Sequence, residues 1–204
     1  MFPNFNCEGA ALEKDVTEKT LESYNDVFAD IVNGLLFNGR LVVKEDELVD
    51  ASPVSQYKIG SKIHEQERDV AKFWRNGTIR LCLYGFENQT KVDSKMPLRI
   101  ISYDGAGYRG QLAKDGRMEN QKHYPVVTLV LYFGMERWKN RNLHSCLEIP
   151  PDLKDYVSDY RINVFEIAWL SPKQVGHFKS DFKIVADYFV QKRTNKKYRP
   201  CETQ

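Results

Sequence analysis

Hydrophobic residues recur along this chain with two different periods, and each period predicts one type of secondary structure. Between residues 17 and 38 they lie three or four positions apart, which places them on one face of an α-helix that Asn38-Gly39 would end. Residues 124–134 and 162–170 are continuous apolar runs, typical of strands that are buried on both faces of a sheet. Apolar residues with helical spacing predict a final helix around residues 178–189.

The middle of the chain predicts a β-hairpin followed by a helix. Residues 67–75 and 78–87 are prone to form strands, and the Asn76-Gly77 pair between them is a strong signal for a tight turn. Residues 94–113 have helical apolar spacing, although three glycines within them each destabilise a helix by roughly 1 kcal/mol relative to alanine. Residues 44–62 are polar and predict a loop.

The order of these elements is helix, hairpin, helix, strand, strand and helix, which predicts a single α/β or α+β domain over residues 1–204. A chain of 204 residues is long enough to bury a sizeable core. We expect this core to extend from about residue 20 to about residue 190, with a basic tail at residues 192–204.

Charge is distributed unevenly along the chain. Residues 1–50 hold eleven acidic against four basic side chains, a net charge of −7, whereas the rest of the chain carries +9. This distribution permits a basic face that binds a polyanion, and it equally fits two solvated faces of opposite sign. Four widely separated cysteines favour a reducing compartment, and no apolar run approaches the roughly 20 residues of a membrane span. Because no secretory signal is evident, we expect a cytoplasmic protein.

The strongest candidate for an active site is the end of the second hairpin strand, where an apolar run ends in Glu87-Asn88-Gln89. Together with Asp69, Glu87 would offer Mg²⁺ the hard oxygen ligands that it prefers. Gln89 lies two residues beyond Glu87 and therefore on the same face, where it would orient a water or a phosphate oxygen. It has no charge and is no general base, so a metal would have to activate the water. On local spacing alone, a solvent-facing strand end explains the same residues.

The hairpin register determines whether Asp69 lies beside Glu87. A two-residue turn pairs Asp69 with Tyr84 and leaves Glu87 on the opposite face. A three-residue loop, or one β-bulge, pairs Asp69 with Leu83. Asp69 then shares a face with Glu87 and Gln89, because strand side chains alternate. The sequence does not decide between these registers, and an active site at this position requires the second.

Other motifs give weaker signals. Residues 105–110, GAGYRG, match a dinucleotide-binding pattern, but the polar segment after them does not predict a helix that would hold a pyrophosphate. The four histidines lack the spacing of a zinc site, and the Gly-x-Ser-x-Gly motif is absent. The basic run KRTNKKYR, residues 192–199, is typical of a solvated tail.

In order and spacing, several segments resemble the PD-(D/E)xK nuclease superfamily, in the branch of putative transposases also called recombination-promoting nucleases. The resemblance extends from about Tyr24 to the C-terminal helix. It is carried by five segments: FADIVNGLLFNGRLVV (28–43), ERDVAKFW (67–74), YGFENQTKVDSKMPLRIISYD (84–104), YRGQL (108–112) and YPVVTLVLYFG (124–134).

The resemblance implies a restriction-endonuclease-like core, an α-β-β-β-α-β mixed sheet flanked by helices. By position, Asp69 corresponds to the motif aspartate and Glu87 to the glutamate of the (D/E)xK element, and the two would bind Mg²⁺, or Mn²⁺ in its place. Gln89 stands where the superfamily often has lysine. The resemblance also implies accessory roles on the two helices beside the sheet, with Asp30 as a further acid and Arg109 and Gln111 facing the substrate.

These implications predict a metal-dependent DNA endonuclease that acts in recombination or transposition and has no membrane partner. Hydrolysis would leave 3′-hydroxyl and 5′-phosphate ends, and a homodimer would suit double-strand cleavage. The alternative is a catalytically silent module that keeps the nuclease fold and binds nucleic acid or protein. Carboxylates of Asp69 and Glu87 on opposite faces would favour that alternative. An RNA-directed nuclease would differ from the first interpretation only in its substrate.

Overall fold

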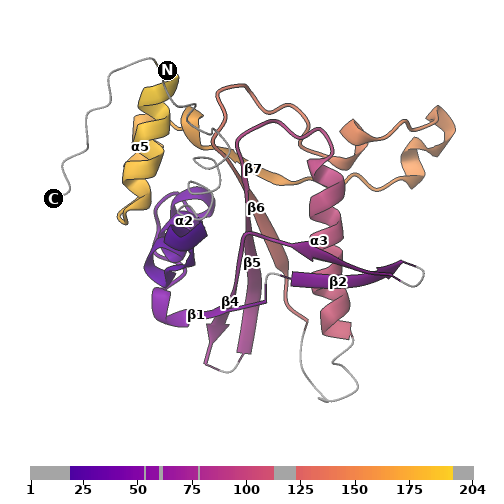
Figure 1. The fold of residues 1–204 in the computed structure, drawn as a ribbon, viewed down its shortest axis with the longest axis horizontal. Coiled ribbons are helices and arrows are strands. Elements are labelled where there is room, and N and C mark those ends of the chain that lie inside the picture. Colours follow the sequence, from indigo (N-terminus) through magenta and orange to yellow (C-terminus); the bar gives the residue numbers. More distant parts are fainter. Residues whose placement is uncertain (1–18, 53, 60–61, 78, 113–122, 195–204) are drawn as a thin grey trace, which may run out of the picture.

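The computed structural model describes residues 19–52, 54–59, 62–77, 79–112 and 123–194, and its centre is a five-stranded mixed sheet. In order across the sheet (Figure 1), the strands are β1 (Leu48–Asp50), β4 (Val70–Asn76), β5 (Ile79–Gln89), β6 (Val126–Tyr132) and β7 (Asn163–Glu166). The pairs β1–β4 and β4–β5 are antiparallel, whereas β5–β6 and β6–β7 are parallel. The chain is therefore a mixed α/β protein.

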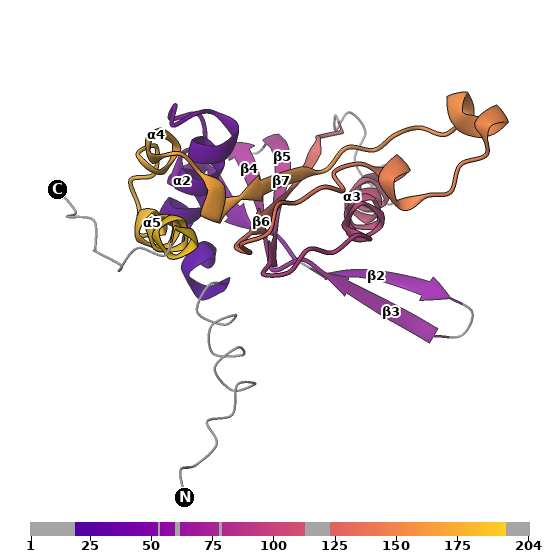
Figure 2. The ribbon, with the colours of Figure 1, turned by 90° about the horizontal axis from the view of Figure 1, so that it is seen from above.

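Helices cover both faces of the sheet (Figure 2). Helix α3 (Met96–Leu112) lies on one face and connects the parallel strands β5 and β6. Helix α2 (Asn25–Leu36), the short α4 (Pro172–Val175) and α5 (Phe182–Arg193) lie on the other face. Among the residues described, no helix combines the length and the apolar character needed to cross a membrane.

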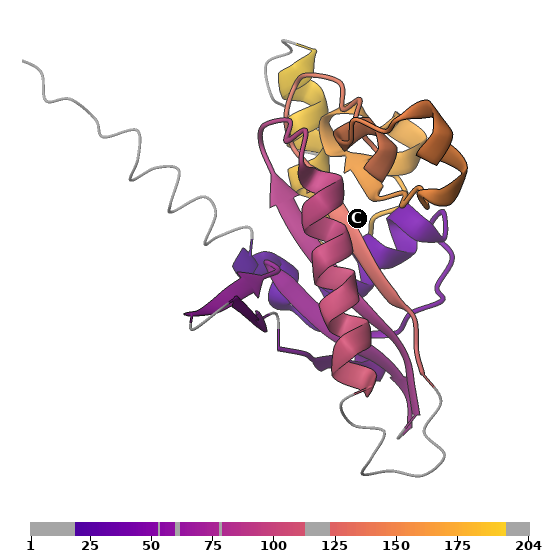
Figure 3. The same ribbon diagram turned by 90° about the vertical axis from the view of Figure 1, so that its right-hand side faces the viewer.

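Helix α3 is continuous although it contains three glycines (Figure 3). Gly107 permits close packing on the sheet, since a Cβ at this position would lie only 3.0 Å from Cγ2 of Val126 in β6. Met96, Ile100 and Tyr103 are buried against the sheet from the same helix. The helix predicted at residues 94–113 is thus confirmed, because its packing against the sheet outweighs its weak intrinsic propensity.

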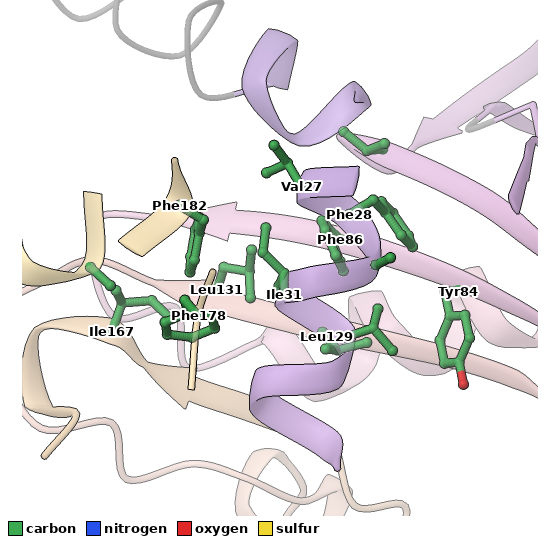
Figure 4. Close-up of a cluster of buried hydrophobic side chains, with 14 of the residues drawn as sticks. Val27, Phe28, Ile31, Tyr84, Phe86, Leu129, Leu131, Ile167, Phe178 and Phe182 are labelled. Carbon is green, nitrogen blue, oxygen red and sulfur yellow. The ribbon is translucent and has the colours of Figure 1, made fainter. Parts of the chain in front are cut away.

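Strand β6 is buried on both faces, as its continuous apolar run predicts. Leu129 and Leu131 belong to the large cluster beneath α2 and α5 (Figure 4), whereas Val130 and Tyr132 pack in the cluster beneath α3. On the first side, Phe28 of α2 stacks on the neighbouring strand β5, because its ring centroid lies 4.1 Å from that of Phe86. These contacts fix β5 and both covering helices against one another.

Helix α2 ends where the sequence predicts and begins later. Asn38 and Gly39 have positive φ angles of 54° and 79°, and the N–H of Gly39 donates to the carbonyl of Asn33 (2.9 Å), which closes the last turn. At the other end, Tyr24 is extended, with φ −69° and ψ 134°. The long helix predicted for residues 17–38 is therefore interrupted at Tyr24, and residues 19–23 form a separate helical segment.

The loop predicted for residues 44–62 is wrong. This region contains a 3₁₀ turn (Glu45–Glu47), strand β1, and strand β2 (Val54–Ile59), which pairs with the antiparallel strand β3 (Lys62–Glu67). The β2–β3 ribbon is separate from the main sheet and projects from it (Figures 1 and 2). These residues are mostly polar, so hydrophobic periodicity carries no signal for strands that pair through their backbones.

The strand predicted for residues 162–170 is shorter than its apolar run. Strand β7 ends at Glu166, and the chain continues as a 3₁₀ helix (Ile167–Trp169) in which Ile167 and Ala168 are buried. A fully buried apolar segment has the same composition whether it is a strand or a helical turn. The final helix is confirmed as α5, which begins at Phe182 and buries Phe182 and Phe189, so Phe178 precedes the helix. Between β6 and β7 the chain also forms two short 3₁₀ helices, Leu143–Cys146 and Pro151–Tyr156.

Candidate functional site

The β4–β5 hairpin turns one residue later than the sequence suggests. Asn76 pairs with Ile79, and the register then shifts by one residue between Trp74 and Arg75, as at a β-bulge. Both pairings predicted for Asp69, with Tyr84 or with Leu83, assume an earlier turn and are wrong.

The observed register nevertheless places the three predicted residues on one face of the sheet. Val70 pairs with Phe86, so one further step sets Asp69 opposite Glu87. The N–H of Asp69 donates to the carbonyl of Phe86 (3.1 Å). Because strand side chains alternate between faces, Gln89 lies on the same side as Glu87. The bulge gives the shared face that an active site requires, and the displaced turn sets Glu87 directly opposite Asp69.

The carboxylate of Asp69 is held on both of its oxygens. Oδ2 accepts a hydrogen bond from the backbone N–H of Asn88 (2.6 Å), so the side chain is tied to the neighbouring strand. Oδ1 lies 2.8 Å from Nζ of Lys19, which comes from the helical segment at residues 19–23. The sheet therefore orients Asp69, and a cation already contacts the oxygen that the backbone leaves available.

Glu87 is buried, with 3% of its surface exposed. Its Oε1 accepts hydrogen bonds from Nε2 of Gln89 (3.1 Å) and from Nη2 of Arg99 (2.5 Å). Its Oε2 is buried and has no hydrogen-bond partner among the described residues. An unsatisfied carboxylate oxygen in the protein interior is unfavourable, and a bound cation would relieve it.

Burial raises the pKa of Glu87 to about 7. The nearby Arg99 guanidinium opposes this rise, whereas the negative charge of Asp69 adds to it. Glu87 consequently exchanges its proton near neutral pH, unlike an ordinary surface glutamate. A buried acid with a raised pKa beside a second carboxylate is an arrangement common at functional sites.

Arg99 connects the strand end to helix α3. Its guanidinium contacts Glu87, the carboxylate of Asp93 (3.3 Å) and the hydroxyl of Tyr103 (3.1 Å). Asp93 in turn accepts a hydrogen bond from the N–H of Lys95 at the start of the helix (2.8 Å). Arg99 is not among the site residues predicted from the sequence. Its only signal is its place in the first turns of the helix that follows Glu87.

The segment at residues 19–23 contributes a second contact, which the sequence analysis also missed. Glu22 is almost fully buried, and its Oε2 accepts a hydrogen bond from Nδ2 of Asn88 (2.7 Å). Lys19 and Glu22 are three residues apart, so they lie on one side of a helical turn. Through them the segment binds the ends of two adjacent strands, at Asp69 and at Asn88.

A second polar cluster lies between the sheet and α3, next to Asp69 in the chain. Arg68 has 2% of its side chain exposed, and it contacts Asp104 (Nη2 to Oδ1, 3.0 Å) and Thr128 (Nε to Oγ1, 3.2 Å). The other oxygen of Asp104 accepts a hydrogen bond from Tyr160 (2.5 Å). Gly85 makes room for this arginine, because a Cβ there would lie 2.3 Å from Cδ of Arg68. This cluster holds α3 against the sheet.

The structure does not bring the three predicted accessory residues to the carboxylate pair. Oδ2 of Asp30 accepts hydrogen bonds from the N–H groups of Lys179 and Ser180 (both 2.8 Å), which fixes the chain before α5. Arg109 is exposed on α3. Gln111 is buried, and its amide makes two hydrogen bonds to the backbone of Tyr124, at 3.0 and 2.9 Å. The contacts of Asp30 and Gln111 serve the fold.

The described part of the chain contains no group of three His, Cys, Asp or Glu side chains arranged to hold a metal ion. A metal at this site would therefore have two protein carboxylates, Asp69 and Glu87. That number suits Mg²⁺, which keeps several waters and is usually bound by one or two carboxylates together with substrate phosphate. The unpartnered Oε2 of Glu87 is the feature that fits such an ion.

Comparison with known protein families gives a match over much of the chain. The family model described as "Putative transposase, YhgA-like" matches residues 80–197, which is more than half of the chain. The matched region includes Glu87, Gln89 and Arg99, whereas Asp69 and Lys19 precede it. No curated protein and no solved structure matches. The chain belongs to the YhgA-like family of putative transposases.

Proposed function

We propose that this chain is a Mg²⁺-dependent endonuclease that hydrolyses DNA phosphodiester bonds in transposition or recombination. The observation that carries the proposal is the pair of carboxylates at adjacent strand ends, in which Glu87 keeps a buried oxygen without a hydrogen-bond partner among the described residues. Membership of a transposase family supports DNA as the substrate.

The order of the elements supports a PD-(D/E)xK, restriction-endonuclease-like core. Elements α2, β1, β4, β5, α3 and β6 follow the sequence α-β-β-β-α-β, and the β2–β3 ribbon is inserted between the first and second of these strands. In this scheme Asp69 immediately precedes the second core strand, and Glu87 lies near the end of the third. These are the positions that the resemblance assigns to the two metal ligands.

Asp69 and Glu87 would hold Mg²⁺, which would polarise a phosphate oxygen and lower the pKa of a water molecule. Gln89 donates to Glu87, so it orients that carboxylate, and its neutral amide suits contact with water or a phosphate oxygen. Arg99 favours the ionised form of Glu87. In the overall hydrolysis, the water oxygen bonds to phosphorus while the P–O3′ bond breaks, and the 3′ oxygen leaves as a hydroxyl group.

The surface beside the site suits a nucleic-acid backbone. Lys91 and Lys95 are exposed in the segment that connects Gln89 to α3. Residues after position 50 carry a net charge of +9. Lysine and arginine side chains supply the phosphate contacts that position a protein on DNA, so binding should weaken as the salt concentration rises.

The test is cleavage of supercoiled plasmid by the purified protein, with Mg²⁺ against EDTA, and with Glu87→Ala in parallel. The wild type should nick DNA only with metal, and Glu87→Ala should not nick while keeping its fold. Glu148→Ala is the matched control, since Glu148 is exposed and outside the cluster. Cleavage by Glu87→Ala at the wild-type rate would reject the assignment. The same series on single-stranded RNA distinguishes the two substrates.

A catalytically silent DNA-binding module is the second candidate, and one observation favours it. Lys19 and Arg99 each contact one of the two carboxylates, so this pair of acids is neutralised without a metal. A silent module would shift DNA in a gel but would not cut it with Mg²⁺ or Mn²⁺. Its DNA binding would also be insensitive to Glu87→Ala.

A further inference from the structure

Lys19 approaches the candidate site from outside the region that the family model matches, and its ammonium group lies 2.8 Å from Oδ1 of Asp69. We propose that Lys19 is a residue of the cleavage site, where it neutralises Asp69 in the absence of a divalent cation and contacts the scissile phosphate once a cation is bound. This inference rests on the proposed function. Lys19 forms and breaks no covalent bond in this role.

Lys19 and a metal ion would compete for one oxygen atom of Asp69. Oδ2 of Asp69 is engaged by the N–H of Asn88, and this contact is set by the pairing of the strands. Oδ1 is consequently the oxygen best placed to bind a metal ion, and Lys19 contacts that atom. Two cations do not share one carboxylate oxygen without strong repulsion, so a metal on Asp69 moves the ammonium group away.

Lys19 stays close to the site after its ammonium group has moved. Its helical segment is also fastened by Glu22, whose buried carboxylate accepts a hydrogen bond from Asn88. The side chain of Lys19 is 38% exposed and ends a long flexible stem, so its head group can leave Asp69 while its backbone remains in place. A phosphate bound at the same carboxylates lies within the reach of that stem.

The net charge of the site also supports a contact between Lys19 and the phosphate. Asp69 and Glu87 carry two negative charges, and Lys19 and Arg99 carry two positive charges, so that a divalent cation brings the four side chains and the metal to +2. A phosphodiester under attack by hydroxide carries a charge of −2 in total, which such a site would match. Without Lys19 the site would be one positive charge short at the stage where charge stabilisation accelerates the reaction.

The experiment compares Lys19→Gln with the wild type in two measurements whose expected changes have opposite signs. Isothermal titration with Mn²⁺ should show roughly fivefold tighter metal binding in the variant, because a competing cation has been removed. Single-turnover cleavage at saturating metal should be slower by roughly tenfold to a hundredfold, because a charge on the phosphate has been lost. Lys19→Arg keeps the charge and should recover most of the rate.

Lys44→Gln is the control, since Lys44 also pairs with an acid, Glu47 at 3.6 Å, and is outside the cluster. It should change neither measurement. If Lys19→Gln instead binds metal more tightly and also cuts faster, Lys19 only inhibits the protein by occupying the metal-binding oxygen of Asp69. Its role in cleavage is then rejected. Unchanged affinity and rate would reduce it to a surface contact.

A wild-type protein that does not cut at all would overturn the proposed function and, with it, the contact to phosphate. In that case the Mn²⁺ titration still decides whether Lys19 and a metal compete for Asp69.

Discussion

Two polar clusters lie side by side against the α3 face of the sheet, and they differ in how completely their members are paired. In the cluster of Arg68 and Asp104, the arginine and both oxygens of the aspartate have partners among buried or half-buried side chains. In the cluster of Asp69 and Glu87, Glu87 keeps a buried oxygen that has no hydrogen-bond partner among the described residues. The two clusters begin at adjacent residues of the chain, Arg68 and Asp69.

This difference in hydrogen bonding distinguishes a cluster that stabilises the fold from one that is suited to bind a ligand. A fully hydrogen-bonded buried network contributes to a defined packing, and the loss of one member leaves an uncompensated charge. A buried acid with an unsatisfied oxygen lowers stability, and such sites persist where binding or catalysis uses them. Substitutions in the cluster of Arg68 and Asp104 should therefore destabilise the fold, whereas neutralising Glu87 should stabilise it.

The largest effect is expected for Arg68→Met. This change leaves Asp104 buried without its cation and should lower the free energy of unfolding by about 3–5 kcal/mol. Urea denaturation followed by circular dichroism measures it. In the double variant Arg68→Met, Asp104→Leu, both charges are gone, and much of the loss should be recovered. A single variant within 1 kcal/mol of the wild type would show that the pair does not hold α3 in place.

Glu87→Gln should have the opposite effect, with a sign that follows from the raised pKa. Between the unfolded value of 4.5 and the folded value of about 7, the native state binds more protons than the unfolded state, so wild-type stability falls as pH rises through this window. Above pH 7 the full loss is present and amounts to about 3 kcal/mol. The variant lacks this acid, so at pH 8 without metal it should be up to about 3 kcal/mol more stable than the wild type.

The pH dependence and the metal dependence of that gain provide the controls. The difference between Glu87→Gln and wild type should largely vanish at pH 4.5, where the acid is protonated in the native state and only half ionised in the unfolded state. Saturating Mg²⁺ should stabilise the wild type by mass action and leave the variant nearly unchanged. A gain that is equal at pH 4.5 and pH 8 would mean that the negative charge of Glu87 is not its cause.

The sequence predicted the elements whose hydrophobic pattern is set by burial. Helix α3 and strand β6 were predicted because their apolar side chains face the cores, and the β4–β5 hairpin because strand-prone residues flank the Asn76-Gly77 turn signal. Asp69 and Glu87 were proposed as partners through a family resemblance and strand alternation, and the structure sets them opposite each other. Which register brings them together was not predictable, since it depends on a turn displaced by one residue and on a bulge.

The contacts around the two acids could not be predicted for a different reason. Lys19 and Arg99 reach the same site from segments on either side of the two strands in the chain, and such a meeting depends on tertiary packing, which has no local signal. Gly85 illustrates the same limit. In the sequence it is only a glycine within a strand, whereas in the structure it provides the space that Arg68 fills.

Gly85→Ala tests whether Arg68 needs the space beside this glycine, and we expect a loss of stability of intermediate size. The added methyl group would overlap Cδ of Arg68 at 2.3 Å, and the arginine or the strand would have to shift, at a cost of about 1–3 kcal/mol. Gly105→Ala on α3 is the matched control, because a Cβ there meets no described atom within 4 Å, and it should stabilise the helix by roughly 1 kcal/mol. Thermal unfolding of both variants should give shifts of opposite sign, and two shifts of the same sign would refute the packing argument.

The smallest effect, and the one that separates fold from site most directly, is expected for Asp30→Asn. Asp30 Oδ2 accepts hydrogen bonds from two backbone N–H groups and from Oγ of Ser180 (2.7 Å), contacts that fix the chain before α5. Weakening them should lower the free energy of unfolding by about 1 kcal/mol and leave metal-dependent cleavage unchanged. Asp26→Asn, at an exposed position on the same helix, should change stability by only a few tenths of a kcal/mol. If Asp30→Asn instead lost cleavage at unchanged stability, Asp30 would be the accessory acid that the family resemblance implies.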